Sequence, residues 1–139
     1  MKNFKLTDET KVINGVTFHR IEAIKDMPIH GVKAGDKGGW VEKESNISGD
    51  AQVSGDAKVS GNAWVSGNAD ICFMSCFGSS NRTTTTFMCA DKIVRVKCGC
   101  FYGDLKEFEQ QIKSTHGDNK YAKQYLAMIE LIKAKFELE

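Results

Sequence analysis

The sequence predicts an α+β protein built on a short left-handed parallel β-helix of hexapeptide repeats, and three observations support this prediction. Branched apolar residues recur every six positions through residues 41–71. An Asn-Gly pair separates two β-forming runs near the N-terminus, and two stretches near the C-terminus have the apolar spacing of helices. We therefore expect an N-terminal β-hairpin cap over 1–40, the β-helix over 41–71, and a C-terminal β-hairpin with two helices over 72–139.

The six-residue repeat is the most regular feature of the chain. Its members are Val41, Ile47, Val53, Val59, Val65 and Ile71, with Ala51, Ala57, Ala63 and Ala69 at the same period. A period of six fits a three-sided coil in which each side points one branched residue inward. Gly with Asp or Asn supplies the corners, because these residues tolerate left-handed backbone angles. The run makes nearly two coils, so we expect its ends to be covered by flanking segments or neighbouring subunits.

The N-terminal segment contains a hairpin signal. Asn14-Gly15 lies between the β-forming runs 11–13 and 16–24, and both residues suit a two-residue turn with positive φ. His19, in the second run, either contacts a ligand or belongs to an edge hairpin that caps the coil.

A β-hairpin and two helices are expected after residue 71, where the hexad pattern stops. Residues 83–90 are rich in β-branched types, and residues 93–101 alternate in polarity. Asp104 and Glu107 have capping-box spacing for the first helix, and Asp118 is the expected cap of the second. The apolar stripes of the helices are expected to pack on the hairpin.

Composition excludes several classes of function. The net charge is +1 with 27% charged residues, so no DNA partner is expected. The N-terminus lacks the apolar core of a signal peptide and no stretch is long enough to span a membrane, which predicts a cytoplasmic protein. Five is an odd number of cysteines, and without an export signal this favours reduced thiols over disulfides. Cys98-Gly-Cys100 departs from zinc-knuckle spacing, so no metal or cofactor is predicted.

The candidate ligand site is the polar segment 79–82 and the four threonines that follow it. Its groups suit an anionic, sugar-bearing ligand, because Arg holds a phosphate through two parallel hydrogen bonds and hydroxyls meet the remaining polar atoms. Aromatic rings nearby offer a surface on which a base can stack. The candidate ligand-binding residues are Asn81, Arg82, Thr83, Thr84, Thr85, Arg95, Phe101, His116, Asn119, Tyr121 and His19.

Each of these candidates also has a purely structural interpretation. A threonine-rich run makes a good exposed strand, and the aromatic residues suit a core. The start of the second helix, next to His116 and Asn119, offers free backbone N–H groups to a phosphate. Lys120 in that first turn is equally well explained as a solvated side chain. The residues alone leave both interpretations open.

Two sets of motifs carry a resemblance to a known family. Residues 6–64 resemble the head of phage-encoded hexapeptide proteins of differing function. The matching pieces are LTDET, NGVTFHRIEAI, VKAGDKGGWVEKESNISG and GNAWVSGNA, of which the last continues to residue 69. The pieces SSNRTTTTF, VKCGCFYG and DLKEFEQQIKSTHGDNKYAKQYL resemble the C-terminal module of small phage proteins. Together they are similar to the Thoeris anti-defence sponge family.

The resemblance implies a viral counter-defence protein in the cytoplasm of an infected bacterium. Members of that family trap cyclic ADP-ribose isomers made by TIR-domain defence enzymes, and some relatives also bind cyclic oligonucleotides. It further implies a homo-oligomer, with dimer or trimer contacts or a hexamer combining them, whose pockets a neighbouring subunit completes. A non-enzymatic sponge is therefore expected. The resemblance assigns no ligand residue position by position.

Two other functions are compatible with the sequence. A hexapeptide-repeat acyltransferase would place a histidine general base beside the coil, yet His19, His30 and His116 all lie outside the repeat. A phage interaction protein, such as an inhibitor of a host enzyme or a structural part, would co-purify with a protein partner and hold no small molecule.

Overall fold

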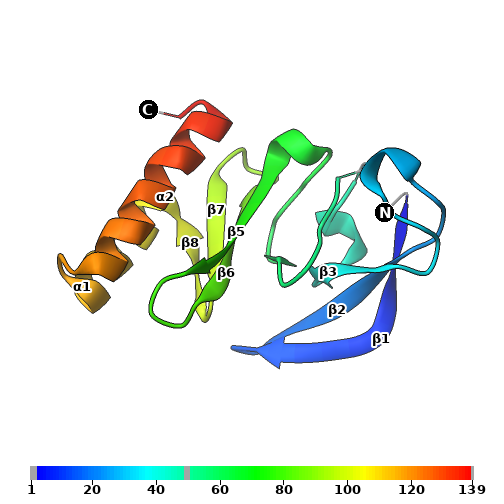
Figure 1. Cartoon of the computed structure of the whole chain (residues 1–139), viewed down its shortest axis with the longest axis horizontal. Coiled ribbons are helices and arrows are strands. Elements are labelled where there is room, and N and C mark those ends of the chain that lie inside the picture. The colour runs from blue at the N-terminus through cyan, green and yellow to red at the C-terminus, as the bar shows by residue number, and fades with distance from the viewer. Residues whose placement is uncertain (1–2, 49–50, 139) are drawn as a thin grey trace.

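The computed structural model describes residues 3–48 and 51–138, which form two four-stranded sheets and two helices (Figure 1). The first sheet contains, in spatial order, β1 (Phe4–Ile13), β2 (Val16–Ala23), β3 (Lys37–Val41) and β4 (Lys58–Val59). The second contains β5 (Ile71–Phe77), β6 (Arg82–Met88), β7 (Val94–Cys98) and β8 (Phe101–Asp104). The helices are α1 (Leu105–His116) and α2 (Lys120–Phe136). The second sheet lies between the helices and the first sheet (Figure 1).

The prediction of a left-handed parallel β-helix over 41–71 is wrong. Between the end of β3 and the start of β5, the described residues contain one two-residue strand, β4, and two 3₁₀ turns, Glu44–Asn46 and Asn68–Asp70. Among the residues that the structure describes, parallel pairing is confined to β3 with β4 and to a single bridge between Ile47 and Val65. The sheets are mostly antiparallel, and within the described ranges neither one closes or continues as a solenoid.

The antiparallel neighbours of the repeat explain this outcome. On one side β3 pairs antiparallel with β2. On the other side Cys89 forms an antiparallel bridge with Ala63, and the Trp64 backbone N–H donates to the Met88 carbonyl at 2.9 Å. Fewer than two coils leave backbone groups unpaired at both ends, and the hairpin and the end of β6 supply the partners. The Gly-Asp corner at 49–50 lies outside the described residues.

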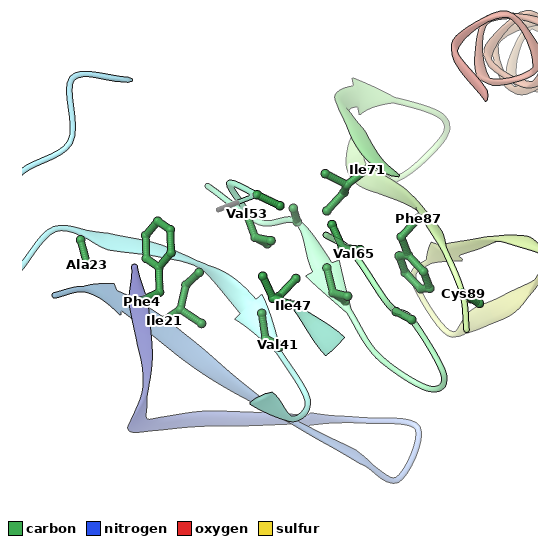
Figure 2. Packing of buried hydrophobic residues seen from close by; sticks show 14 of the residues in the cluster. Phe4, Ile21, Ala23, Val41, Ile47, Val53, Val65, Ile71, Phe87 and Cys89 are labelled. Atoms are coloured by element: carbon green, nitrogen blue, oxygen red, sulfur yellow. The ribbon is translucent and has the colours of Figure 1, made fainter. Parts of the chain in front are cut away.

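The branched residues of the repeat nevertheless build the first core. Val41, Val53, Val59 and Val65 are fully buried, together with residues from β1, β2 and the end of β6 (Figure 2). Ala69 is exposed, so the small-residue pattern ends at Ala63. Burying each large branched side chain stabilises the fold by about 1.5–3 kcal/mol.

The N-terminal hairpin is present where the Asn-Gly pair predicts it. Ile13 pairs with Val16 across the turn, and Asn14 and Gly15 have φ values of 52° and 81°. Positive φ at both central positions matches the right-handed twist of the two strands.

The helices cover one face of the second sheet and enclose a second core. That core is formed by Val94, Val96, Cys98, Phe108, Ile112, Ala122, Tyr125, Met128, Ile129 and Ile132. Asp104 and Glu107 form the predicted capping box of α1. The cap of α2 is Asn119 and not Asp118, because the Asn119 side chain accepts from the backbone N–H groups of Tyr121 and Ala122.

The second sheet has more strands than the predicted hairpin. β6 and β7 correspond to the expected runs 83–90 and 93–101. The apolar run after residue 71 is the added strand β5, and the end of the second run turns at Gly99 into β8. In the described part of the chain, neither helix is long and apolar enough to cross a membrane.

Candidate functional site

A cavity of about 250 Å³ lies between segment 78–82, the β7–β8 turn and helix α1. We call it the helix-side cavity. Three residues that the sequence analysis selected, Arg82, Phe101 and His116, line it together although they are far apart in the chain. Its other lining residues are Ser79, Cys98, Cys100, Phe108, Gln111, Ile112, Thr115 and Tyr125.

The Arg82 guanidinium lies over the β7–β8 turn. A Cβ atom at Gly99, whose φ is 58°, would collide with Arg82 Nη1, so the close approach requires glycine. Among the described residues, Arg82 forms no ion pair with a carboxylate. A guanidinium has five N–H donors in a planar fork that matches carboxylate and phosphate oxygens. Arg82 is exposed to solvent and therefore presents a cation without a carboxylate partner to the helix-side cavity.

The segment that carries Arg82 is held against α2. The Gly78 backbone N–H donates to Gln124 Oε1 at 2.7 Å. The Tyr125 ring also approaches Gly78 so closely that a Cβ there would collide with the hydroxyl. Burial raises the pKa of Tyr125 to about 12, in keeping with a hydroxyl that is packed inside the protein. The start of the segment is therefore anchored.

Aromatic rings line the cavity next to this cation. The His116 ring stacks on Tyr125, with centroids 5.7 Å apart and planes at 22°, and lies 5.8 Å from the Tyr121 ring. Phe101 packs against Phe108 at 5.2 Å. His116 and Phe101 are half-buried, so each keeps some surface free. Such surfaces can stack on a planar base.

The predicted threonine rim does not line this cavity. Thr84 and Thr85 are buried, and their hydroxyls are used within the protein: Thr84 donates to Cys98 Sγ at 3.3 Å, and Thr85 accepts from the Lys58 backbone N–H at 2.9 Å. Thr83 shares a 2.7 Å hydrogen bond with Ser75. Because helices cover one face of β6 and the first sheet covers the other, alternate threonines point into two different layers.

Arg95 lies away from Arg82. Its guanidinium binds Asp91 through two hydrogen bonds of 2.8 Å, and Nη1 also approaches Asn62 Oδ1 at 3.4 Å. These contacts, chiefly the hydrogen bond from Arg95, lower the pKa of Asp91 to about 2. Arg95 therefore has a structural partner already.

The remaining candidates have separate positions. His19 belongs to the first sheet, where Nδ1 lies 3.0 Å from the Thr7 carbonyl oxygen. Asn119 is the cap of α2. Asn81 is exposed in the β5–β6 turn with φ at 51°, and Tyr121 is not among the cavity's lining residues, although its ring lies 5.8 Å from that of His116. Ligand contacts by these residues stay a prediction.

Two polar residues of the cavity, Gln111 and Thr115, are not among those predicted from the sequence. Gln111 and Thr115 lie one turn apart on α1, and the Gln111 amide donates to the Thr115 hydroxyl at 2.9 Å. Their spacing places them on the same helix face that reaches His116. That helical spacing was a usable signal, whereas the contribution of Tyr125 depends on how α2 packs on α1.

Two cysteines and a histidine are among the residues that line the cavity. Cys98, Cys100 and His116 all line it. Cys98 is buried between Thr84 and Tyr125, whereas Cys100 is exposed. The five cysteines are unpaired, and the described segments contain no cluster of three His, Cys, Asp or Glu side chains suited to a metal ion.

Comparison of the chain with protein-family models, with curated proteins and with solved structures found no match.

Proposed function

We propose that this protein is a viral counter-defence sponge, which binds a cyclic ADP-ribose isomer made by TIR-domain defence enzymes and sequesters it without cleavage. The observation that carries the proposal is the helix-side cavity, where the Arg82 guanidinium, which has no ion pair to a described carboxylate, lies near half-buried aromatic rings. The resemblance of segments 79–87 and 96–126 to the Thoeris anti-defence family supports the choice of ligand.

The cavity residues match the chemistry of such a ligand. Arg82 would hold the pyrophosphate through paired N–H donors. Ser79, Gln111 and Thr115 offer the donors and acceptors that ribose hydroxyls require. The purine would stack on a free ring surface such as that of His116, a contact worth about 1–3 kcal/mol.

The size of the cavity favours a homo-oligomer. Pockets for ligands of drug size usually have about 300–1,000 Å³, and this one has about 250 Å³. A neighbouring copy of the chain would supply the missing wall and exclude water. We propose dimer or trimer contacts, or a hexamer that combines them.

The proposal is tested by ligand recovery. Purified protein is incubated with the product of a TIR-domain enzyme, washed and heated, and the released compound is identified by mass spectrometry. We expect unchanged cyclic ADP-ribose isomer.

Arg82→Ala should lose at least about tenfold in affinity, because one charged hydrogen-bonding group contributes more than 1.4 kcal/mol. Lys113→Ala is the matched control, because it removes an exposed cation that lies outside the cavity lining. Recovery of a cleaved product, or equal binding by both variants, would contradict the proposal.

One observation favours a second candidate, a thiol-dependent hydrolase. Cys100 is exposed and lines the same cavity as His116, and a cysteine with a histidine within hydrogen-bond reach forms a common nucleophile and base. In that case wild-type protein would release a cleaved nucleotide, and Cys100→Ser would release the intact one.

A further inference from the structure

A second group of cations lies between the two sheets, away from the helix-side cavity. The register pairs Lys11 with Phe18, Arg20 with Trp40, and Trp40 with Lys58. Residues paired across strands share a face, so one face of the first sheet carries Lys11, Arg20 and Lys58. Lys97 approaches this face from the second sheet, with Nζ 5.9 Å from the Phe18 ring centre. We call Lys11, Arg20, Lys58 and Lys97, with Trp40, the inter-sheet basic cluster.

Trp40 is the centre of this cluster. Its ring centre lies 4.1 Å from Lys11 Nζ and 5.0 Å from Arg20 Cζ. Trp40 is only 6% exposed, and neither its Nε1 nor Arg20 Nε, both buried, has a hydrogen-bond partner among the described residues. Buried N–H donors without acceptors are unfavourable in a folded protein. The cluster therefore has unused hydrogen-bonding capacity as well as charge.

Lys97 is the least expected member, because it is a lysine with 4% exposure. In the described parts of the chain, its ammonium has no hydrogen-bond or ion-pair partner. Burial lowers the pKa of Lys97. An ammonium with no counter-charge is rarely buried in a protein, because the charge loses its hydration.

The other cations lack carboxylate partners as well. No ion pair within 4.0 Å joins Lys11, Arg20 or Lys58 to an acidic residue that the structure describes. Lys58 Nζ donates to the backbone oxygen of Asp56 at 2.9 Å. Burial lowers the pKa of Lys58, and the charges of Lys11 and Lys97 lower it further, while Asp56 opposes this shift. Four cations thus lie together without an ion pair to a described carboxylate, and Asp56 acts on Lys58 alone.

We propose that the inter-sheet basic cluster is a second binding site, which takes a small phosphate-bearing anion. A phosphate dianion has enough acceptor oxygens to meet several ammonium groups and the unpaired N–H donors at once. A buried Lys97 between two sheets favours a small anion over a nucleic-acid backbone, which would contact exposed cations. The site is independent of the helix-side cavity, because Lys97 and its neighbour Cys98 point to opposite faces of β7.

The test uses pyrophosphate as the probe. Its binding is measured by titration calorimetry, and its effect on Tm is measured by thermal unfolding. All proteins in the test carry Arg82→Ala, so that the helix-side cavity cannot contribute a phosphate contact, and the protein with this change alone is the background protein. We expect saturable binding and a rise in Tm. Lys97→Met and Lys58→Met should each weaken binding at least about tenfold, because each removes one charge-assisted contact. Methionine keeps the length of the apolar stem, so both variants are expected to fold.

Lys92→Met is the matched control. Lys92 lies over a tryptophan as Lys11 of the cluster does, with Nζ 5.1 Å from the Trp64 ring centre, but Lys92 is not part of the cluster. This variant should bind pyrophosphate as the background protein does. Absence of binding by folded background protein, or equal binding by all variants, would overturn the proposal. Tight binding of a short RNA without binding of pyrophosphate would overturn it too.

Discussion

At the residue scale, the position of Arg82 depends on the absence of a side chain at Gly99. The guanidinium occupies the space that a Cβ would take, and the backbone there has φ at 58°. Glycine therefore has two roles at this position: it permits the left-handed turn between β7 and β8, and it lets the cation reach the helix-side cavity.

Gly99→Ala should destabilise the fold by about 1–3 kcal/mol, because alanine is strained at positive φ, and it should also weaken ligand binding. Gly31→Ala is the control, since Gly31 has φ at 68° but nothing within 4 Å of an added Cβ. Urea denaturation measures stability and calorimetry measures binding. Equal ligand binding by the two variants would contradict this role of Gly99.

The Asp91–Arg95 pair predicts a pH dependence of stability. The contacts of Asp91, led by the hydrogen bond from Arg95, lower its pKa from 3.8 to about 2. A carboxylate with a depressed pKa in the folded state stabilises the fold above the unfolded-state value, and this contribution is lost as the pH falls through the folded value. Stability should therefore fall between about pH 4 and pH 2 more steeply in wild type than in Asp91→Asn. Parallel urea-midpoint curves for the two proteins would contradict this.

At the element scale, the start of α2 depends on one side chain. Asn119 Oδ1 accepts 3.0 Å hydrogen bonds from both Tyr121 N and Ala122 N. Asn119→Ala should therefore cost about 1 kcal/mol of stability, the usual effect of losing a helix cap. Asp118→Ala should change the free energy of unfolding by less than half as much, because Asp118 makes no cap contact. Chemical denaturation monitored by helical circular dichroism distinguishes the two, and an equal loss would show that the cap is misassigned.

β6 is the element that joins the two halves of the protein. Its Phe87 belongs to the first core and its Met88 packs against the second. Each face of the strand packs into a different core. The Thr84 and Thr85 side chains are therefore buried there, and their hydroxyls form hydrogen bonds within the protein. This explains why the run that suggested a hydroxyl-rich ligand rim contributes mainly Arg82, at its first position, to the cavity.

At the scale of the whole molecule, the shared strand predicts one cooperative unfolding transition. Trp40 and Trp64 report on the first half, and helical circular dichroism reports on the second. The two signals should change at the same denaturant concentration. Phe87→Ala should lower stability by about 3–5 kcal/mol and shift both signals together. Separate midpoints would show that residues 72–139 fold as an independent domain.

The sequence alone determined the features that depend on neighbouring residues. The Asn14-Gly15 turn, the capping box of Asp104 and the inward-facing valines of the repeat all appear in the structure. Each is a local signal, because φ preference, hydrogen bonding to the next turn and burial of one face act over a few residues. Arg82, Phe101 and His116 were recognisable as candidates from the chemistry of their side chains, without any knowledge of their neighbours in the fold.

The path of the repeat and the composition of the site depend on tertiary contacts. A six-residue period specifies which residues point inward but not what pairs with the open edges, and here β2 and the end of β6 pair with them. The same packing gives Arg95 a carboxylate partner, leaves Arg82 without one, and gathers Lys97 with cations of the first sheet. These outcomes depend on contacts between residues far apart in the chain, which no local pattern specifies.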